Sequence, residues 1–119
     1  LVGYQKDPLS WLQALDLFVL PTTADEGIPV SLMQAMACEV PVISTPVGGI
    51  PEIISDGRTG LLVNSATNEA VGQAIMRVFT DSALFRRLAG QGFELTQEKF
   101  GLHTMLNNLE AVYFEAMKR

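Results

Sequence analysis

A short acidic loop leads into a segment whose residue types could bind an anion. Proline fits the first position of a helix, where its missing N–H leaves no donor unpaired, so we predict that a helix begins at Pro29. The N–H groups of the next three residues would then lie free at the positive end of the helix dipole, where phosphate oxygens bind. These three residues are Val30, Ser31 and Leu32.

The same helix end could instead be satisfied by the chain itself. Asp25 and Glu26 precede it, and a carboxylate that folds back would cap the helix. Ile28 has no side-chain acceptor for that purpose. From the residues of this segment, anion binding and acidic capping both stay open.

The predicted helix carries a single polar stripe. Ser31 and Gln34 are three positions apart and therefore share one face. The other directions are apolar up to Cys38, so we expect the helix, Cys38 included, to be buried on most sides. A buried helix with one polar edge usually directs that edge toward a ligand or a partner.

The first half of the chain alternates between strand and helix patterns. Apolar runs at residues 17–20, 40–44 and 61–63 predict three strands, the first of them fully buried and stopped by Pro21. Asp7 and Pro8 predict a short helix with Leu9 and Leu12 facing inward, and another short helix is expected from Pro51 to Asp56-Gly57. This order favours a three-layer, Rossmann-like α/β fold with a parallel sheet. Ligands of such sheets bind beyond the carboxyl ends of the strands, where the loops of Glu26 and of Gly48-Gly49 would meet.

From about residue 67 the pattern is helical. Thr67 or Asn68 would cap one helix, and Thr80 or Asp81 the next, which Gly90 and Gly92 would interrupt or end. A last amphipathic helix follows Gly101. We interpret its apolar residues as core or docking surface: Met105, Leu106, Leu109, Val112, Tyr113 and Ala116.

Composition excludes several classes of protein. Thirteen acidic and eight basic side chains give a net charge of −5, so nucleic acid is not an expected partner. One cysteine excludes an internal disulfide, and with one histidine and no ligand spacing we expect no metal. No apolar run approaches the roughly 20 residues of a membrane span, so we expect a cytoplasmic protein.

Several motifs together resemble one enzyme family. Residues 17–63 read LFVLPTTADEGIPVSLMQAMACEVPVISTPVGGIPEIISDGRTGLLV. This run resembles the donor-binding, C-terminal domain of the retaining, GT-B-type glycosyltransferases of family 4 (group 1). The family has a Glu, seven residues and a second Glu, followed by a P-V-I strand, a G-G loop and a D-G-x-x-G turn. The likeness extends over nearly all of residues 1–119, which we expect to be a single domain.

The chain departs from the family pattern at one position. Eight residues after Glu26 stands Gln34, where the family has its second Glu. By resemblance, Glu26 would contact the hydroxyls of the donor sugar as the catalytic acidic residue, and position 34 would bind the ribose hydroxyls. Glutamine keeps one carbonyl acceptor but loses the charge, so ribose binding should weaken by about 1 kcal/mol without being abolished.

The resemblance implies transfer of a sugar from a nucleotide-diphosphate donor to a glycan or lipid-linked acceptor, without a metal or other cofactor. The implied donor-binding residues, besides Gln34, are the segment 27–32 and Gly48 with Gly49. The family's diphosphate-binding Arg/Lys pair and acceptor domain precede the part matched here, so we expect a piece of a longer protein with little activity alone. That further domain is the expected route to the acceptor and to any peripheral attachment at the inner membrane. The exposed strand edge of such a piece predicts self-association.

A second class of function stays open beside the enzyme. A glutamine at position 34 would also suit a non-catalytic module. Such a module would have kept only a weak nucleotide site or a surface for protein partners. A glycine-rich loop and an Arg/Lys pair in a preceding domain would favour the enzyme.

Overall fold

Three short parallel strands form the centre of the protein. The structure, a computed structural model, describes residues 2–25 and 27–118. Its strands are β1 (Phe18–Leu20), β2 (Val42–Ser44) and β3 (Leu61–Leu62), in the order β1-β2-β3. Phe18 pairs with Val42 and Ile43 with Leu61, both in parallel register. The predicted parallel α/β sheet is therefore confirmed.

The burial of β1 differs from the prediction. Its three residues are half-buried, whereas those of β2 are fully buried. β2 has a neighbour on both sides, but β1 lies at the edge of the sheet in the described residues. A run of apolar residues indicates that both faces of a strand are apolar. It does not indicate whether a neighbouring strand covers the edge of that strand.

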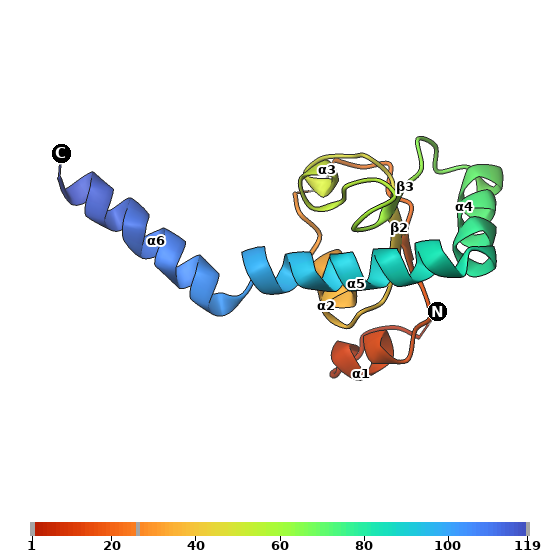
Figure 1. Ribbon diagram of the computed structural model, residues 1–119, viewed down its shortest axis with the longest axis horizontal. Helices are drawn as coiled ribbons and strands as arrows, with labels where there is room; N and C mark the ends of the chain where they lie inside the picture. Colours follow the sequence, from red (N-terminus) through yellow and green to blue (C-terminus); the bar gives the residue numbers. More distant parts are fainter. Residues whose placement is uncertain (1, 26, 119) are drawn as a thin grey trace.

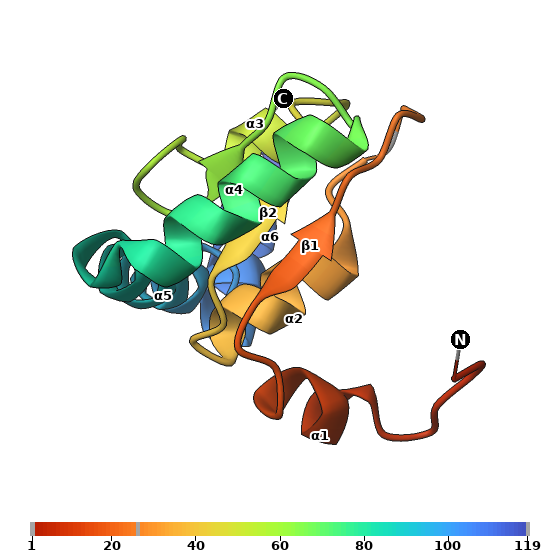
Figure 2. The ribbon, with the colours of Figure 1, turned by 90° about the vertical axis from the view of Figure 1, so that its right-hand side faces the viewer.

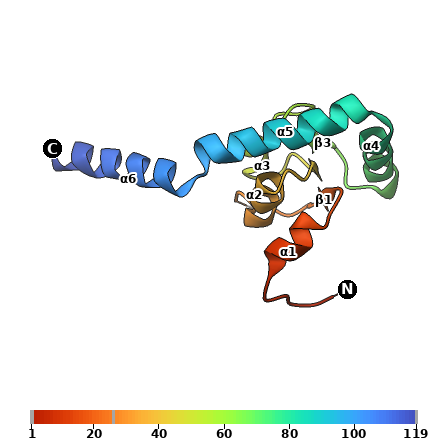
Figure 3. The ribbon, with the colours of Figure 1, turned by 60° about the horizontal axis from the view of Figure 1, so that its bottom comes forward.

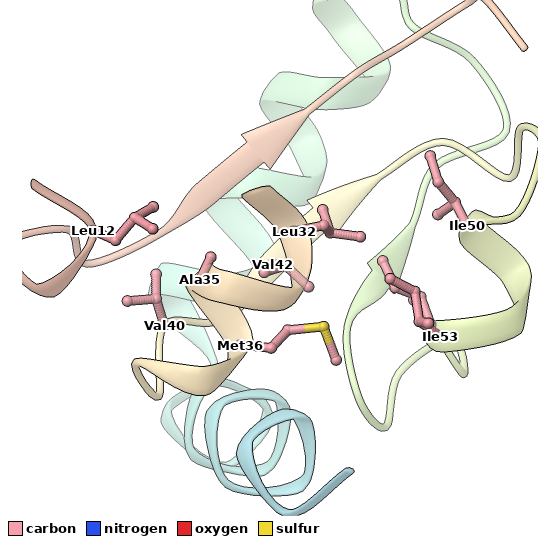
Figure 4. Packing of buried hydrophobic residues seen from close by; sticks show 9 residues of the cluster. Leu12, Leu32, Ala35, Met36, Val40, Val42, Ile50 and Ile53 are labelled. Atoms are coloured by element: carbon pink, nitrogen blue, oxygen red, sulfur yellow. The ribbon is translucent and has the colours of Figure 1, made fainter. Parts of the chain in front are cut away.

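Helices cover both faces of the sheet. α2 (Val30–Ala37) lies on one face and α4 (Asn68–Thr80) on the other (Figure 2). Successive residues of β2 point to opposite faces, so Val42 packs with α2 and Ile43 with α4. α5 (Ser82–Lys99) contacts both of these helices. The buried cluster around α2 is drawn in Figure 4. Its buried members are Leu12, Leu32, Ala35, Met36, Val40, Val42, Ile50, Ile53 and Ile54.

The long helices begin at the residues that the sequence predicts. The Thr67 hydroxyl accepts a hydrogen bond from the Ala70 N–H at 3.3 Å and caps α4. The Asp81 carboxylate accepts from the N–H groups of Ala83 and Leu84 and caps α5. The prediction that glycines end this helix is wrong, because α5 continues through Gly90 and Gly92 to Lys99. A Cβ at position 92 would lie 3.0 Å from the Thr59 carbonyl oxygen, so this glycine lets α5 approach the turn before β3.

The short helices bring two further differences. α1 (Pro8–Gln13) is capped by Asp7 as predicted, and Leu12 is buried, but Leu9 is 51% exposed and does not face inward. α3 (Ile50–Ile53) is a single turn that ends before Asp56. Asp56 instead accepts a hydrogen bond from the Leu62 N–H at 2.8 Å and stabilises the turn that leads into β3.

The last helix extends away from the rest of the molecule. α6 (Leu102–Met117) follows Gly101 and projects from the end of α5 (Figures 1 and 3). It has no buried residue. The prediction that its apolar residues are core is wrong, and the alternative, a docking surface, stays a prediction. The exposed large apolar side chains are Leu102, Met105, Leu106, Leu109, Val112, Tyr113, Phe114 and Met117. Among the described helices, none combines the length and the apolar character that crossing a membrane requires.

Candidate functional site at the start of helix α2

Helix α2 begins one residue later than the sequence predicts. Pro29 has φ −66° and ψ 120°, which is extended backbone, and it is the N-cap rather than the first helical residue. The fixed φ of proline suits both positions, so its presence alone does not distinguish them. Val30 is the first residue of the helix.

In the part of the chain that the structure describes, two of the three N–H groups predicted to be free at the first turn of α2 have no acceptor. The Leu32 N–H donates to the Pro29 carbonyl at 3.1 Å, so the prediction that it is available is wrong. Within residues 2–25 and 27–118, no group accepts a hydrogen bond from the N–H of Val30 or Ser31. Both residues are exposed.

The acidic cap that the sequence left open is not formed by Asp25. Its carboxylate accepts no hydrogen bond from the start of α2, and the first turn of the helix holds no acidic residue. Glu26, the predicted catalytic residue, lies outside the described residues. In the described part of the chain, the positive end of α2 therefore faces outward without a neutralising carboxylate of its own.

The loops after β1 and β2 lie against each other, as predicted. A Cβ at Gly49 would lie 3.0 Å from the Gly27 carbonyl carbon and 3.0 Å from Cγ1 of Ile28. Gly48 has φ +57°, a conformation that favours glycine. The structure thus brings the glycine loop to the start of α2, where Gly49 acts as a packing position. Contact of either glycine with a donor stays a prediction.

A cavity of about 290 Å³ runs along one face of α2 toward the end of α5. Val30 and Gln34, one helical turn apart, both line it, so it joins the free end of α2 to the position predicted to bind ribose. Its lining residues are Val30, Met33, Gln34, Ala37, Thr96, Gln97, Phe100 and Gly101.

Helix α2 is less buried than the sequence predicts, because one of its faces borders this cavity. Val30 is 61% exposed, and Ser31, Gln34 and Ala37 are exposed as well, so only the face with Leu32, Ala35 and Met36 is buried. Cys38 is half-buried. The alanine and valine on the open face look like core residues in the sequence because an apolar side chain can line a cavity as well as a core.

Sequence reasoning missed the far wall of the cavity. Thr96, Gln97 and Phe100 come from the end of α5, more than 60 positions after Val30. No local pattern indicates that these residues face α2. The only available signal was Gly92, whose lack of a side chain lets α5 lie close to Met36 and Thr59.

A second, larger cavity of about 620 Å³ lies between α2, the end of α5 and α6. Its walls are mostly apolar, with Met33, Phe100, Met105, Leu109 and Val112 among them. Lys99 and Asn108 are its polar lining residues, and it does not include the start of α2, where the sequence predicts the anion site. Among the described residues, His, Cys, Asp and Glu side chains form no group of three that could hold a metal ion.

Comparisons of the sequence identify the family. Residues 1–81 match the family model described as Glycosyl transferases group 1. The N-acetyl-alpha-D-glucosaminyl L-malate synthase of Bacillus anthracis is 30% identical over 114 residues, covering 96% of this chain and 30% of that enzyme. The capsular polysaccharide biosynthesis glycosyltransferase CapM of Staphylococcus aureus is 30% identical over 118 residues, 99% of this chain and 31% of that protein. The chain thus spans about a third of the length of these curated relatives.

Solved structures agree with this assignment. The C-terminal domain of LpcC, a group 1 glycosyl transferase of Francisella tularensis, matches with a TM-score of 0.73 and 29% identity, over 86% of this chain and 52% of that one. HepE of Anabaena, solved with UDP, matches with a TM-score of 0.90 and 21% identity, over 96% of this chain and 31% of that one, and shows the same fold. The chain belongs to the group 1 glycosyltransferases and corresponds to their GT-B C-terminal domain.

Proposed function

We propose that this chain is the donor-binding part of a retaining glycosyltransferase of family 4. Such an enzyme transfers a sugar from a nucleotide-diphosphate donor to a glycan or lipid-linked acceptor. Membership of the group 1 family supports sugar transfer as the activity. CapM of S. aureus and the lipopolysaccharide core mannosyltransferase LpsB of Rhizobium meliloti, both 30% identical, are named for polysaccharide assembly, which favours an acceptor of this class.

One structural observation carries the proposal. The N–H groups of Val30 and Ser31, which have no acceptor among the described residues, lie at the start of α2. Val30 also borders the cavity that extends to Gln34. A diphosphate bound at these N–H groups would place a ribose one helical turn further along, beside the amide of Gln34. The arrangement suits a ligand with a charged group at one end and hydroxyls behind it.

The chemistry follows from the charge that develops during transfer. When the bond between the sugar and the diphosphate breaks, negative charge builds on the departing diphosphate. Backbone N–H groups and the helix dipole of α2 stabilise such charge without reorganising. In this proposal no metal is required, Glu26 accepts hydrogen bonds from the sugar hydroxyls, and basic side chains of a preceding domain contribute the rest.

The proposal assigns donor binding, and not full turnover, to these 119 residues. In it, the acceptor site and the diphosphate-binding basic pair belong to a preceding domain. We therefore expect the chain alone to bind a donor weakly and to transfer little or no sugar. Full transfer rates from the isolated chain would contradict this part of the proposal.

Calorimetric titration of the chain with UDP-glucose, GDP-mannose and ADP-glucose tests the proposal. UDP-glucose is the first choice because the HepE structures contain UDP or UDP-glucose. We expect one of the three to bind and the free nucleoside to bind far more weakly, because it lacks the diphosphate. Equal binding of nucleoside and nucleotide sugar, or binding of none of them, would contradict the proposal.

Gln34 supports a second candidate, a non-catalytic module. An amide at this position lowers the expected affinity for ribose, which would suit a domain that has lost turnover. The two candidates differ in one measurement. A module that has kept only a surface for protein partners would show no affinity for any nucleotide sugar, and Gln34→Glu would not restore it.

A further inference from the structure

Thr45 fastens the loop after β1 to the end of β2. Thr45 directly follows β2 and is 3% exposed, so its side chain is held within the protein. Its hydroxyl donates a hydrogen bond to the Thr22 carbonyl at 2.5 Å. Thr22 lies two residues beyond the end of β1, so this bond joins the strand end to the loop and not to another strand.

The hydroxyl of Ser44, the residue before Thr45, makes a hydrogen bond within the sheet instead. Ser44 is fully buried and donates to the Leu20 carbonyl at 2.7 Å. Leu20 is also the register partner of Ser44 in the sheet, so this bond lies between two paired strands. Ser44 and Thr45 therefore offer a matched pair of buried hydroxyls, one holding the sheet and the other holding the loop.

Thr22 also makes hydrogen bonds to neighbouring residues of the same loop. The Thr22 N–H donates to the Leu20 carbonyl at 3.0 Å, and the Thr22 hydroxyl accepts from the Ala24 N–H at 3.3 Å. Leu20, Thr22 and Ala24 are thus joined by local hydrogen bonds. Later in the same loop, Gly27 and Ile28 pack against Gly49. Thr22 on one side, and Gly27 with Ile28 on the other, are therefore each held by a residue that follows β2.

We propose that Thr45 is a positioning residue of the donor site, an inference that rests on the proposed function. Its hydroxyl holds Thr22, in the loop whose acidic residue the proposed function assigns to the donor sugar, whereas the N–H groups of Val30 and Ser31 are oriented by α2 itself. Loss of this hydroxyl affects the contacts to the sugar more than the contacts to the diphosphate. Thr45 is then a determinant of how tightly the sugar part of the donor is held.

The test compares Thr45→Val, which keeps the shape of the side chain but removes its donor, with Thr45→Ser, which keeps the hydroxyl. The affinities of the 119-residue chain for UDP and for UDP-glucose are measured by calorimetry, with the other two donors of the panel and their diphosphates as further pairs. In Thr45→Val we expect UDP affinity within about twofold of the wild type, and an additional loss of about threefold to tenfold for UDP-glucose. Thr45→Ser restores the wild-type ratio, and Ser44→Ala leaves that ratio unchanged.

A second readout needs no ligand. Backbone amide exchange of residues 23–25 and 27–28 is compared in the same variants, and we expect faster exchange in Thr45→Val but not in Ser44→Ala. Should Thr45→Val not fold, Thr45→Ala removes the same donor with less crowding. Unchanged exchange in Thr45→Val, or an equal loss of affinity for UDP and UDP-glucose, overturns the inference. A wild-type chain that binds no donor contradicts the proposed function and the donor-site role together, and amide exchange then shows whether Thr45 still holds the loop.

Discussion

The backbone of Gly49 lies directly against the carbonyl group of Gly27. A Cβ built on Gly49 would come within 3.0 Å of the Gly27 carbonyl carbon and 3.1 Å of its oxygen. Real Cβ atoms rarely approach backbone so closely, and a backbone group cannot rotate away as a side chain does. The start of α2 is thus set by a glycine more than 20 residues later in the chain.

This contact predicts the effect of Gly49→Ala. The added methyl group should displace residues 27–28 and lower the free energy of unfolding by about 1–3 kcal/mol, as overpacking does. We expect weaker binding of UDP-glucose as well, because the displaced segment leads directly into α2. Urea unfolding and calorimetry measure the two effects. Gly72→Ala in α4 is the matched control, since nothing lies within 4 Å of its Cβ position, and it should raise stability by about 0.5–1 kcal/mol. Wild-type stability and affinity in Gly49→Ala would contradict the tight contact.

Gln34→Glu should strengthen donor binding. A carboxylate accepts charge-assisted hydrogen bonds from ribose hydroxyls, so we expect a gain of about 1 kcal/mol, or about fivefold in affinity for UDP-glucose. Gln97→Glu places the same charge on the opposite wall of the cavity and should give no gain. Equal effects of the two substitutions would show that charge near the cavity, and not a contact at position 34, changes the affinity.

Asp7 should titrate below its ordinary value. The hydroxyl and then the backbone N–H of Ser10 donate hydrogen bonds to this carboxylate and hold the pKa of Asp7 below 3.8. A lowered pKa in the folded state means that the cap stabilises α1 above pH 3.8 and that this contribution is lost as the pH falls through the lowered value. Carbon-13 NMR titration of the carboxyl group measures it, and Ser10→Ala should raise the pKa toward 3.8. A midpoint at or above 3.8 in the wild type would contradict the cap.

The isolated chain should self-associate at high concentration. Within the described residues, β1 has an unpaired edge and α6 exposes large apolar side chains that nothing covers. Sedimentation velocity over a concentration series measures the association. Leu109→Glu, which places a charge on the apolar face of α6, should reduce it, while Glu110→Lys should not. A single monomeric species at all concentrations would count against this prediction.

Local signals in the sequence were sufficient for the helix caps and the strands. Thr67 and Asp81 cap α4 and α5 through bonds to residues two or three positions away, and each strand is marked by its own apolar run. Such interactions are visible within a few residues of sequence. The parallel order followed because strands and helices alternate.

The errors arose where distant residues decide the structure. Gly92 looked like a helix end because its close approach to Thr59 is invisible locally. Val30 looked like core because the cavity it borders is completed by the end of α5. The bond of the Thr45 hydroxyl has no local signal in the sequence, because its acceptor lies 23 residues earlier. The start of α2 was misplaced by one residue because proline suits both positions.

The most direct measurement follows the backbone N–H signals of the chain by ¹⁵N NMR during titration with the donor that binds, beginning with UDP-glucose. We expect the signals of Val30 and Ser31 to shift most among those of α2, UDP to shift them similarly, and uridine to leave them in place. Signals of Val30 and Ser31 that stay in place while the donor binds elsewhere would show that the start of α2 is not the diphosphate site.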